Sequence, residues 1–419
     1  MAKRIWISPI TTKCKLNIAL DLFVLLLFSI TFFSIPAFSF IGTGKYVTWA
    51  LTLFLLTSIS VSLFLFYEIK IDVISFSFLL FAVSSFVSSA LCGFKAFKTT
   101  PIFLSLLTFA IYTYAKSIKG SVRLNSFLFF AFTGSILFLF LFIFKYRSEL
   151  IHLDFNRIGS EFGDENDIAL FLAFGLLCSF YYGTDFHRDT IIFNIFCLFL
   201  ILLFGLCGFS TGSKIFILIS FLCFLYFPFA KCGKKKWWLA LLINLSLVAV
   251  FFVLINLPFL STIRDRFFSF LSTLFGKSVG QGKTNELSTI NRMDMFYCGM
   301  QMWIRKPMFG WGIWGFATFS GRAGGWSHNN ISESFCNFGL IGTFLFHFGF
   351  IMSFYYFFQS KHKKEKMLSF ALLLFYVLMM VSVALNSQKL YALVSGVVFA
   401  SICENKSLIS FCCLKNKWS

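Results

Sequence analysis

The sequence has few charged residues, and this shortage decides the class of protein. Only 13% of the 419 residues are charged, whereas 58% are hydrophobic and 65 are Phe. The mean hydropathy is +0.84. Such a chain cannot cover a soluble fold with polar surface, so a soluble domain is excluded and a multi-pass membrane protein is predicted.

Other features are also missing. No carboxylate pair and no His/Cys cluster has the spacing of metal ligands, so we expect neither a metal nor a cofactor. Most of the 12 cysteines fall in apolar runs, which argues against a disulfide framework. The first apolar run is too long for a cleavable signal and lacks a small-residue cleavage site. We therefore expect residence in an inner or plasma membrane.

About twelve apolar runs are long enough, or nearly so, to cross a bilayer as helices. The predicted fold is an all-α polytopic membrane protein with one large outer loop. The predicted spans are Ile18–Ser39, Tyr46–Tyr67, Ile71–Cys92, Pro101–Ala115, Leu124–Phe144, Asp167–Tyr182, Thr190–Phe209, Ile215–Ala230, Trp237–Leu260, Phe335–Phe358, Met367–Leu385 and Leu390–Cys403.

Lysine and arginine set the expected orientation, because short cytoplasmic loops carry the excess of positive charge. Most of the 36 basic residues lie in segments that would share one side with both termini, so both termini are expected in the cytoplasm. Four regions follow: N-terminal helices (1–144), central helices with a first polar outer loop (145–260), a large periplasmic loop (261–334), and C-terminal helices with a cytoplasmic tail (335–419).

Two carboxylates lie near the ends of predicted spans. Asp21 and Asp72 are expected to be hydrated there. Intramembrane carboxylates often have a function, but a position near a span end favours a structural anchor.

Two longer outer segments, Lys145–Asn166 and Ser261–Glu333, carry mixed charge. They are either simply solvated or hold a discrete site for an anion. In the first segment, Arg157 has the fork geometry to bind phosphate oxygens, or it pairs with Glu161 or Asp164. Either Asp164 or Asn166 can cap the helix that follows.

The short stretch Ser210-Thr-Gly-Ser-Lys214 joins two predicted spans. Thr211, Ser213 and the free N–H groups of the next helix could cradle an anion beside Lys214, or the stretch is only a good turn. The large loop contains Gly276–Ser288, which is expected to be mobile. An amphipathic helix, Arg292–Trp303, follows and must end at Pro307.

The stretch from Trp326 to Gly342 places His328, Asn329 and Glu333 directly before a long apolar run. Histidine has a pKa suited to general acid–base work at neutral pH. The alternative is a helix-capping or buried structural histidine. Glu333 could orient His328 only if the histidine precedes the helix, because five residues turn about 500° in an α-helix.

From Arg157 onward, five motifs occur in order. They are Arg157-x-Gly with Asn166, Thr-Gly-Ser-Lys214, Arg292, Lys306-Pro-x-x-Gly-x-Gly, and His328-Asn followed by Gly339-x-x-Gly342. This order resembles the O-antigen ligase and polymerase superfamily of membrane glycosyltransferases. The resemblance implies an architecture like that of GT-C enzymes and an undecaprenyl-pyrophosphate-linked glycan as substrate. Chain-length regulator or other polysaccharide-assembly proteins are implied partners, and nucleic acid is not.

The resemblance assigns the essential histidine to His328 and the two essential cations to Arg292 and Lys214. The family usually has arginine at the position of Lys214. Lysine supplies the same positive charge but cannot bind two phosphate oxygens at once as a guanidinium does. The family's common glutamate is replaced by Asn337. The chemistry itself requires a base near the attacking hydroxyl and cations for the departing pyrophosphate.

The predicted catalytic residues are therefore His328, Arg292 and Glu333. The predicted pyrophosphate-binding residues are Lys214, Arg157, Arg292, Ser213 and Asn329. The motif His-Asn-x-x-x-Glu before Phe-Gly-Leu-Ile-Gly, together with the high Phe content, favours a polymerase. A ligase that transfers the glycan to lipid A-core is the alternative. A polysaccharide transporter or flippase is less favoured, because the sequence indicates neither inverted repeats nor broken helices.

Overall fold

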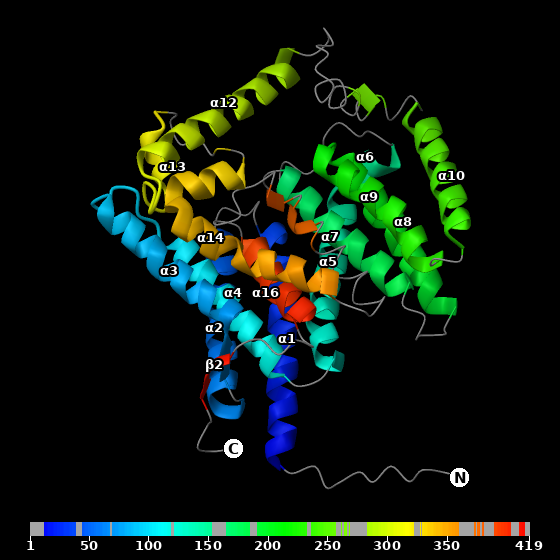
Figure 1. The fold of residues 1–419 in the computed structure, drawn as a ribbon. Coiled ribbons are helices and arrows are strands. Elements are labelled where there is room, and N and C mark those ends of the chain that lie inside the picture. Colours follow the sequence, from blue (N-terminus) through cyan, green and yellow to red (C-terminus); the bar gives the residue numbers. More distant parts are fainter. Residues whose placement is uncertain are drawn as a thin grey trace.

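The structure is a computed structural model (Figure 1). It describes residues 12–38, 44–67, 69–118, 121–152, 165–184, 191–232, 236–256, 261, 264–265, 268, 283–321, 327, 329–359, 373, 375–377, 379–380, 389–403 and 410–414.

Within these residues the chain is almost entirely helical. The helices are α1 (Thr12–Ala37), α2 (Gly44–Phe66), α3 (Val73–Leu91), α4 (Thr100–Ser117), α5 (Ser121–Lys145), α6 (Arg147–Ile151), α7 (Glu165–Thr184), α8 (Ile191–Ser210), α9 (Lys214–Cys232), α10 (Trp237–Ile255), α12 (Lys283–Arg305), α13 (Gly315–Phe319), α14 (Asn330–Gln359) and α16 (Lys389–Cys403). Every predicted span except Met367–Leu385, which is described only in part, coincides with one of them.

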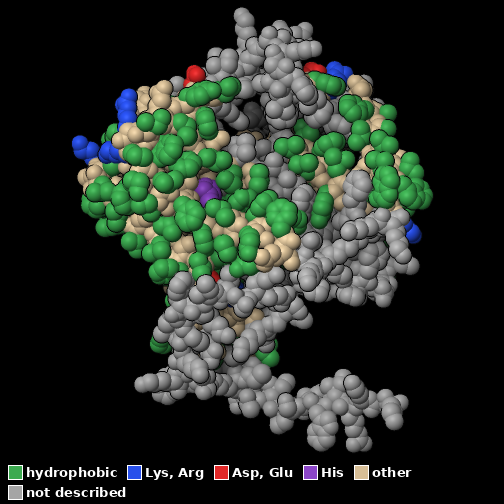
Figure 2. All heavy atoms as spheres, in the orientation of Figure 1, with side chains coloured by type: hydrophobic (Ala, Val, Ile, Leu, Met, Phe, Trp, Pro, Cys, Tyr) green, Lys and Arg blue, Asp and Glu red, His purple; other side chains and the backbone are tan. Residues whose placement is uncertain are grey.

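Seven of the described helices are long and apolar enough to cross a membrane, and parts of α9, α10 and α16 are shorter apolar helices. Their outer faces are apolar as well, for example at Ile192, Leu198 and Leu202 of α8, which are 81%, 57% and 65% exposed. Figure 2 shows hydrophobic side chains over much of the visible surface. This pattern is what a multi-pass membrane protein requires.

A small sheet departs from the all-α prediction. Strand β1 (Ile69–Asp72) pairs antiparallel with β2 (Ser410–Leu414), with Ile69 opposite Leu414. One strand lies between α2 and α3, and the other lies in the C-terminal tail. The pairing agrees with the expectation that these two segments share one side of the membrane.

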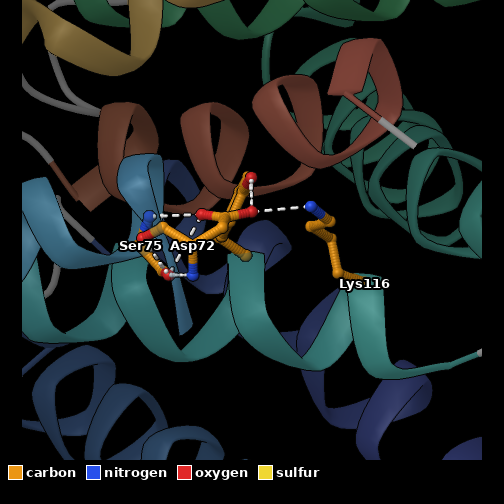
Figure 3. Close-up of polar contacts among 4 residues, drawn as sticks. Asp72, Ser75 and Lys116 are labelled. Carbon is orange, nitrogen blue, oxygen red and sulfur yellow. Dashed lines mark hydrogen bonds and ion pairs between the residues drawn. The ribbon is translucent and has the colours of Figure 1, made fainter. Parts of the chain in front are cut away.

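The two carboxylates expected to be hydrated are instead buried, since Asp21 is 7% and Asp72 is 3% exposed. Asp72 accepts hydrogen bonds from Lys116 Nζ at 2.6 Å and Tyr112 Oη at 2.8 Å (Figure 3). Its other oxygen caps α3 by accepting from the Ser75 N–H. Burial of the charge is tolerated because these partners satisfy it, so the anchor interpretation holds and the hydration prediction is wrong.

Buried Asp21 is likewise satisfied by hydrogen bonds, but from tyrosine hydroxyls. Its carboxylate accepts from Tyr67 Oη at 2.6 Å and from Tyr114 Oη at 2.6 Å. The tyrosines come from the end of α2 and from α4, so one buried carboxylate joins three segments. The polar contacts of Asp21 and Asp72 therefore both converge on α4.

The region after residue 282 differs from its prediction in two ways. Helix α12 begins at Lys283, so the second half of Gly276–Ser288 is helical; residues 276–282 lie outside the described residues. Helix α12 ends at Arg305, directly before Lys306-Pro307, as predicted. Helix α14 begins at Asn330, earlier than the predicted Phe335, and it is broken at Gly339, where φ is 65° and ψ is −166°.

The backbone groups at the break form hydrogen bonds with the loop that follows α12. Trp311 N donates to Cys336 O at 2.9 Å, and Gly312 N donates to Asn337 O at 3.0 Å. On the other side of the break, Leu340 N donates to Pro307 O at 2.8 Å. The groups freed by the break thus find partners in the loop, as they must inside a membrane protein. We call this arrangement of residues 306–316 and 336–341 the α14 joint.

Glycine allows the two backbones to meet. A Cβ on Gly339 would lie 2.4 Å from the Met308 carbonyl, and one on Gly310 would lie 2.6 Å from the Asn337 carbonyl. Both residues also have positive φ. Any larger residue at these positions would push the loop away from the break.

The end of α3 supports the α14 joint from the opposite side. Ser88 Oγ donates to Asn337 O at 2.9 Å and accepts from Gly312 N at 3.0 Å. Ser89 Oγ accepts from Ile313 N at 3.1 Å. Two serine hydroxyls therefore bind the loop and the broken helix to a third element, which fixes the position of the first half of α14.

We predict that Gly339→Ala lowers stability by about 3 kcal/mol, because it combines a backbone conformation open only to glycine with a clash against the loop. Gly321→Ala is the matched control: Gly321 also has positive φ, but nothing lies within 4 Å of an added Cβ. Thermal unfolding of the purified variants in detergent measures both. Equal melting temperatures for the two variants would contradict the α14 joint.

Candidate functional site

The polar stretch predicted as the site forms a compact turn at the start of α14. Asn329 is the cap of the helix, since its Oδ1 accepts from Ile331 N at 3.0 Å and from Ser332 N at 3.2 Å. The helix begins at Asn330, so position 328 precedes it, as an interaction with Glu333 requires. His328 itself lies outside the described residues, and its role stays a prediction.

Glu333 reaches back from the first turn of α14 and is 3% exposed. Its Oε2 accepts from Ser327 N at 3.2 Å and lies 3.0 Å from Ser327 Oγ. Burial disfavours the charged form of this side chain, whereas the two contacts with Ser327 and the positive N-terminal end of α14 favour it. The contacts of Glu333 fix the residue before His328, so it serves to position that turn.

Helix α12 packs against the first half of α14. Gly299 lies against Ser332, and the rings of Trp303 and Phe335 are 4.8 Å apart. Position 292 lies two turns before Gly299 on the same face of α12, about 10 Å along its axis. The described residues include the backbone of Arg292 but not its side chain. The fold therefore places this predicted cation on the helix that supports the α14 turn.

A second polar contact joins two of the motifs. Ser213 Oγ donates to Asn166 Oδ1 at 3.0 Å, which links the α8–α9 turn to the start of α7. Asn166 lies inside α7, so of the two predicted alternatives for the helix cap, Asp164 or Asn166, the second is wrong. Asp164 and Arg157 lie outside the described residues.

The α8–α9 turn itself is tight, with Gly212 at φ 62°. Thr211 Oγ1 donates to Gly208 O at 2.7 Å, so the hydroxyls of both Thr211 and Ser213 already have partners within the protein. Lys214 is the first residue of α9, and its side chain lies outside the described residues. A cradle here would consist of the N–H groups at the start of α9 and the lysine, without free hydroxyls.

Sequence reasoning mentioned Asn337 only as a departure from the family's glutamate. In the structure it is 1% exposed and central to the α14 joint, where its Oδ1 accepts from Phe316 N at 2.8 Å. The signal that could have found it is its place two residues before Gly339. The motif glycines at 310, 312 and 339 are thereby explained as parts of one packing contact.

Among the described residues, no group of three or more His, Cys, Asp or Glu side chains could hold a metal ion. No protein-family model matches the chain, and no curated protein matches its sequence. The resemblance stated above therefore rests on the motifs themselves. Of these, the structure brings together Asn166 with Ser213, and the Lys-Pro-x-x-Gly-x-Gly loop with Gly339.

We predict a coupling of about 1 kcal/mol between Ser213 and Asn166 in a double-mutant cycle of Ser213→Ala and Asn166→Ala, because removal of either partner breaks the same hydrogen bond. Ser210→Ala is the control, since Ser210 Oγ bonds Cys207 O within its own helix. The free energy of unfolding of the detergent-purified variants is measured for this cycle and for a control cycle of Ser210→Ala with Asn166→Ala. Additive effects for Ser213 and Asn166 would mean that the two motifs are independent.

Proposed function

We propose that the chain is a membrane glycosyltransferase that polymerises undecaprenyl-pyrophosphate-linked repeat units at the periplasmic face of the inner membrane. The observation that carries this proposal is the pairing of motif segments far apart in the sequence. Asn166 contacts Ser213, and the loop after Lys306 seals the break at Gly339. Motifs that assemble in pairs are expected of one functional unit.

In this proposal the turn before α14 receives the acceptor hydroxyl. His328 takes its proton, held in place by a turn that Glu333 and Asn329 stabilise from either side. Arg292 on α12, Lys214 at the start of α9 and Arg157 neutralise the departing pyrophosphate. The positive N-terminal end of α14 adds to this field.

A ligase would use the same donor and the same cations, and it differs only in its acceptor. A transporter is the third candidate, and the broken α14 is a feature found in such proteins. In transporters, however, the backbone groups at a break contact the substrate or ion. Here the carbonyls of Cys336 and Asn337 and the N–H groups of Leu340 and Ile341 bond to the loop or to Ser88, so these groups are not available to a substrate.

The proposal is tested by giving the purified protein a single lipid-linked repeat unit that serves as both donor and acceptor. We predict a ladder of longer lipid-linked products, no ladder for His328→Ala, and a ladder that Glu333→Gln retains better than Glu333→Ala. Glutamine keeps an oxygen that accepts from Ser327, so Glu333→Gln is a control for the fold of the turn.

The acceptor that supports product formation distinguishes a polymerase from a ligase. Product formed only after lipid A-core is added would identify a ligase. Absence of product with either acceptor, or full activity of His328→Ala, would refute the proposed function.

A further inference from the structure

Three lysines from distant parts of the chain meet at the starts of three helices. Lys45 lies at the start of α2, Lys98 precedes α4, and Lys389 begins α16. Lys389 Nζ lies 4.3 Å from the ring centroid of Trp49, which stands one turn after Lys45 on the same helix. The ring of Trp49 also packs against Phe103 in the first turn of α4, with ring centroids 5.2 Å apart, so the starts of α2, α4 and α16 lie close together. We call Lys45, Lys98 and Lys389 the lysine corner.

Aromatic rings hold two of the three ammonium groups in place. Lys98 Nζ lies 3.3 Å above the ring of Trp314, and Trp314 N donates to Ala96 O at 2.8 Å. Each cation is thus fixed on a tryptophan, the residue type most typical of the membrane–water interface. Figure 2 shows Lys and Arg side chains gathered at the margin over α3, α12 and α13, the side from which Lys98 comes.

The lysine corner has no acidic partner among the residues that the structure describes. The three stretches that carry the lysines, residues 38–45, 92–99 and 385–389, contain no Asp or Glu. In the described part of the chain, no ion pair joins any of the three to a carboxylate. The N-terminal ends of α2, α4 and α16 add positive charge, although the ends of α1 and α3 lie beside them. Burial and the neighbouring Lys45 both lower the pKa of Lys98.

The surroundings of the lysine corner are apolar and exposed. Tyr46 and Val47 on α2 are 75% and 44% exposed, and Leu91 and Phe94 at the end of α3 are 62% and 48% exposed. Clustered cations beside an apolar rim suit a molecule with an anionic head and hydrocarbon chains. A free anion would gain nothing from the apolar rim.

We propose that the lysine corner binds the phosphate headgroup of an anionic membrane lipid, with the acyl chains against Tyr46, Val47, Leu91 and Phe94. The site uses none of the residues assigned to glycosyl transfer. It is therefore independent of the proposed function, and each can fail without the other.

The test measures the melting temperature of the full-length protein in neutral detergent with increasing dilauroyl phosphatidic acid. We expect a concentration-dependent rise, absent with dilauroyl phosphatidylcholine and with inorganic phosphate. Lys98→Gln and Lys389→Gln should each weaken the apparent affinity about fivefold, the effect of one lysine near an anionic surface. Lys95→Gln is the matched control from the same loop and should change it less than twofold.

Lys45→Gln provides a test that unfolding cannot imitate. It removes repulsion without removing a cation–aromatic contact, so this variant should melt above the wild type without lipid and gain less from phosphatidic acid. Equal losses of affinity in Lys95→Gln and Lys98→Gln would reduce the effect to general surface charge and overturn the proposal. An equal rise with inorganic phosphate would overturn the assignment to a lipid.

Discussion

A helix that breaks inside a membrane protein leaves N–H and C=O groups that cannot hydrogen-bond to lipid. The arrangement of α3, α12 and α14 depends on which protein groups bond to them instead. At Gly339 they bond to the loop after Pro307, which donates to the carbonyls of Cys336 and Asn337 and accepts from Leu340. Ser88 and Ser89 of α3 accept hydrogen bonds from Gly312 N and Ile313 N of the same loop. One constraint thus fixes the loop, the first half of α14 and the end of α3 together.

The candidate site follows from this geometry. The first half of α14 turns away from the second half (Figure 1) and carries its polar start with it. Asn329 caps that start and Glu333 binds Ser327, so the residues on both sides of position 328 are held by hydrogen bonds. Helix α12, which carries Arg292, packs against the same half-helix through Gly299 and Trp303. The α14 joint therefore positions Ser327 and Asn329, which flank the predicted base in sequence, and the helix that carries one predicted cation.

Local properties could be predicted from the sequence. Hydropathy is local, so the predicted apolar runs coincide with helices wherever the structure describes them, and seven of these helices are long and apolar enough to cross a membrane. Helix α12 ends just before Pro307, as expected. The break at Gly339 was missed because a glycine in an apolar run does not alter hydropathy, and its partner Met308 lies 31 residues earlier. The burial of Asp21 and Asp72 was missed for the same reason, since their tyrosine partners come from other segments. Long-range partners also decided the role of Asn166 and the assembly of the lysine corner.

Hydrogen exchange of the protein in lipid nanodiscs tests the α14 joint most directly. The account predicts that the amides of Trp311, Gly312, Leu340 and Ile341 exchange as slowly as those in the second half of α14, because each donates to a carbonyl across the joint. Exchange at these amides as fast as at the open Gly321 turn would contradict it.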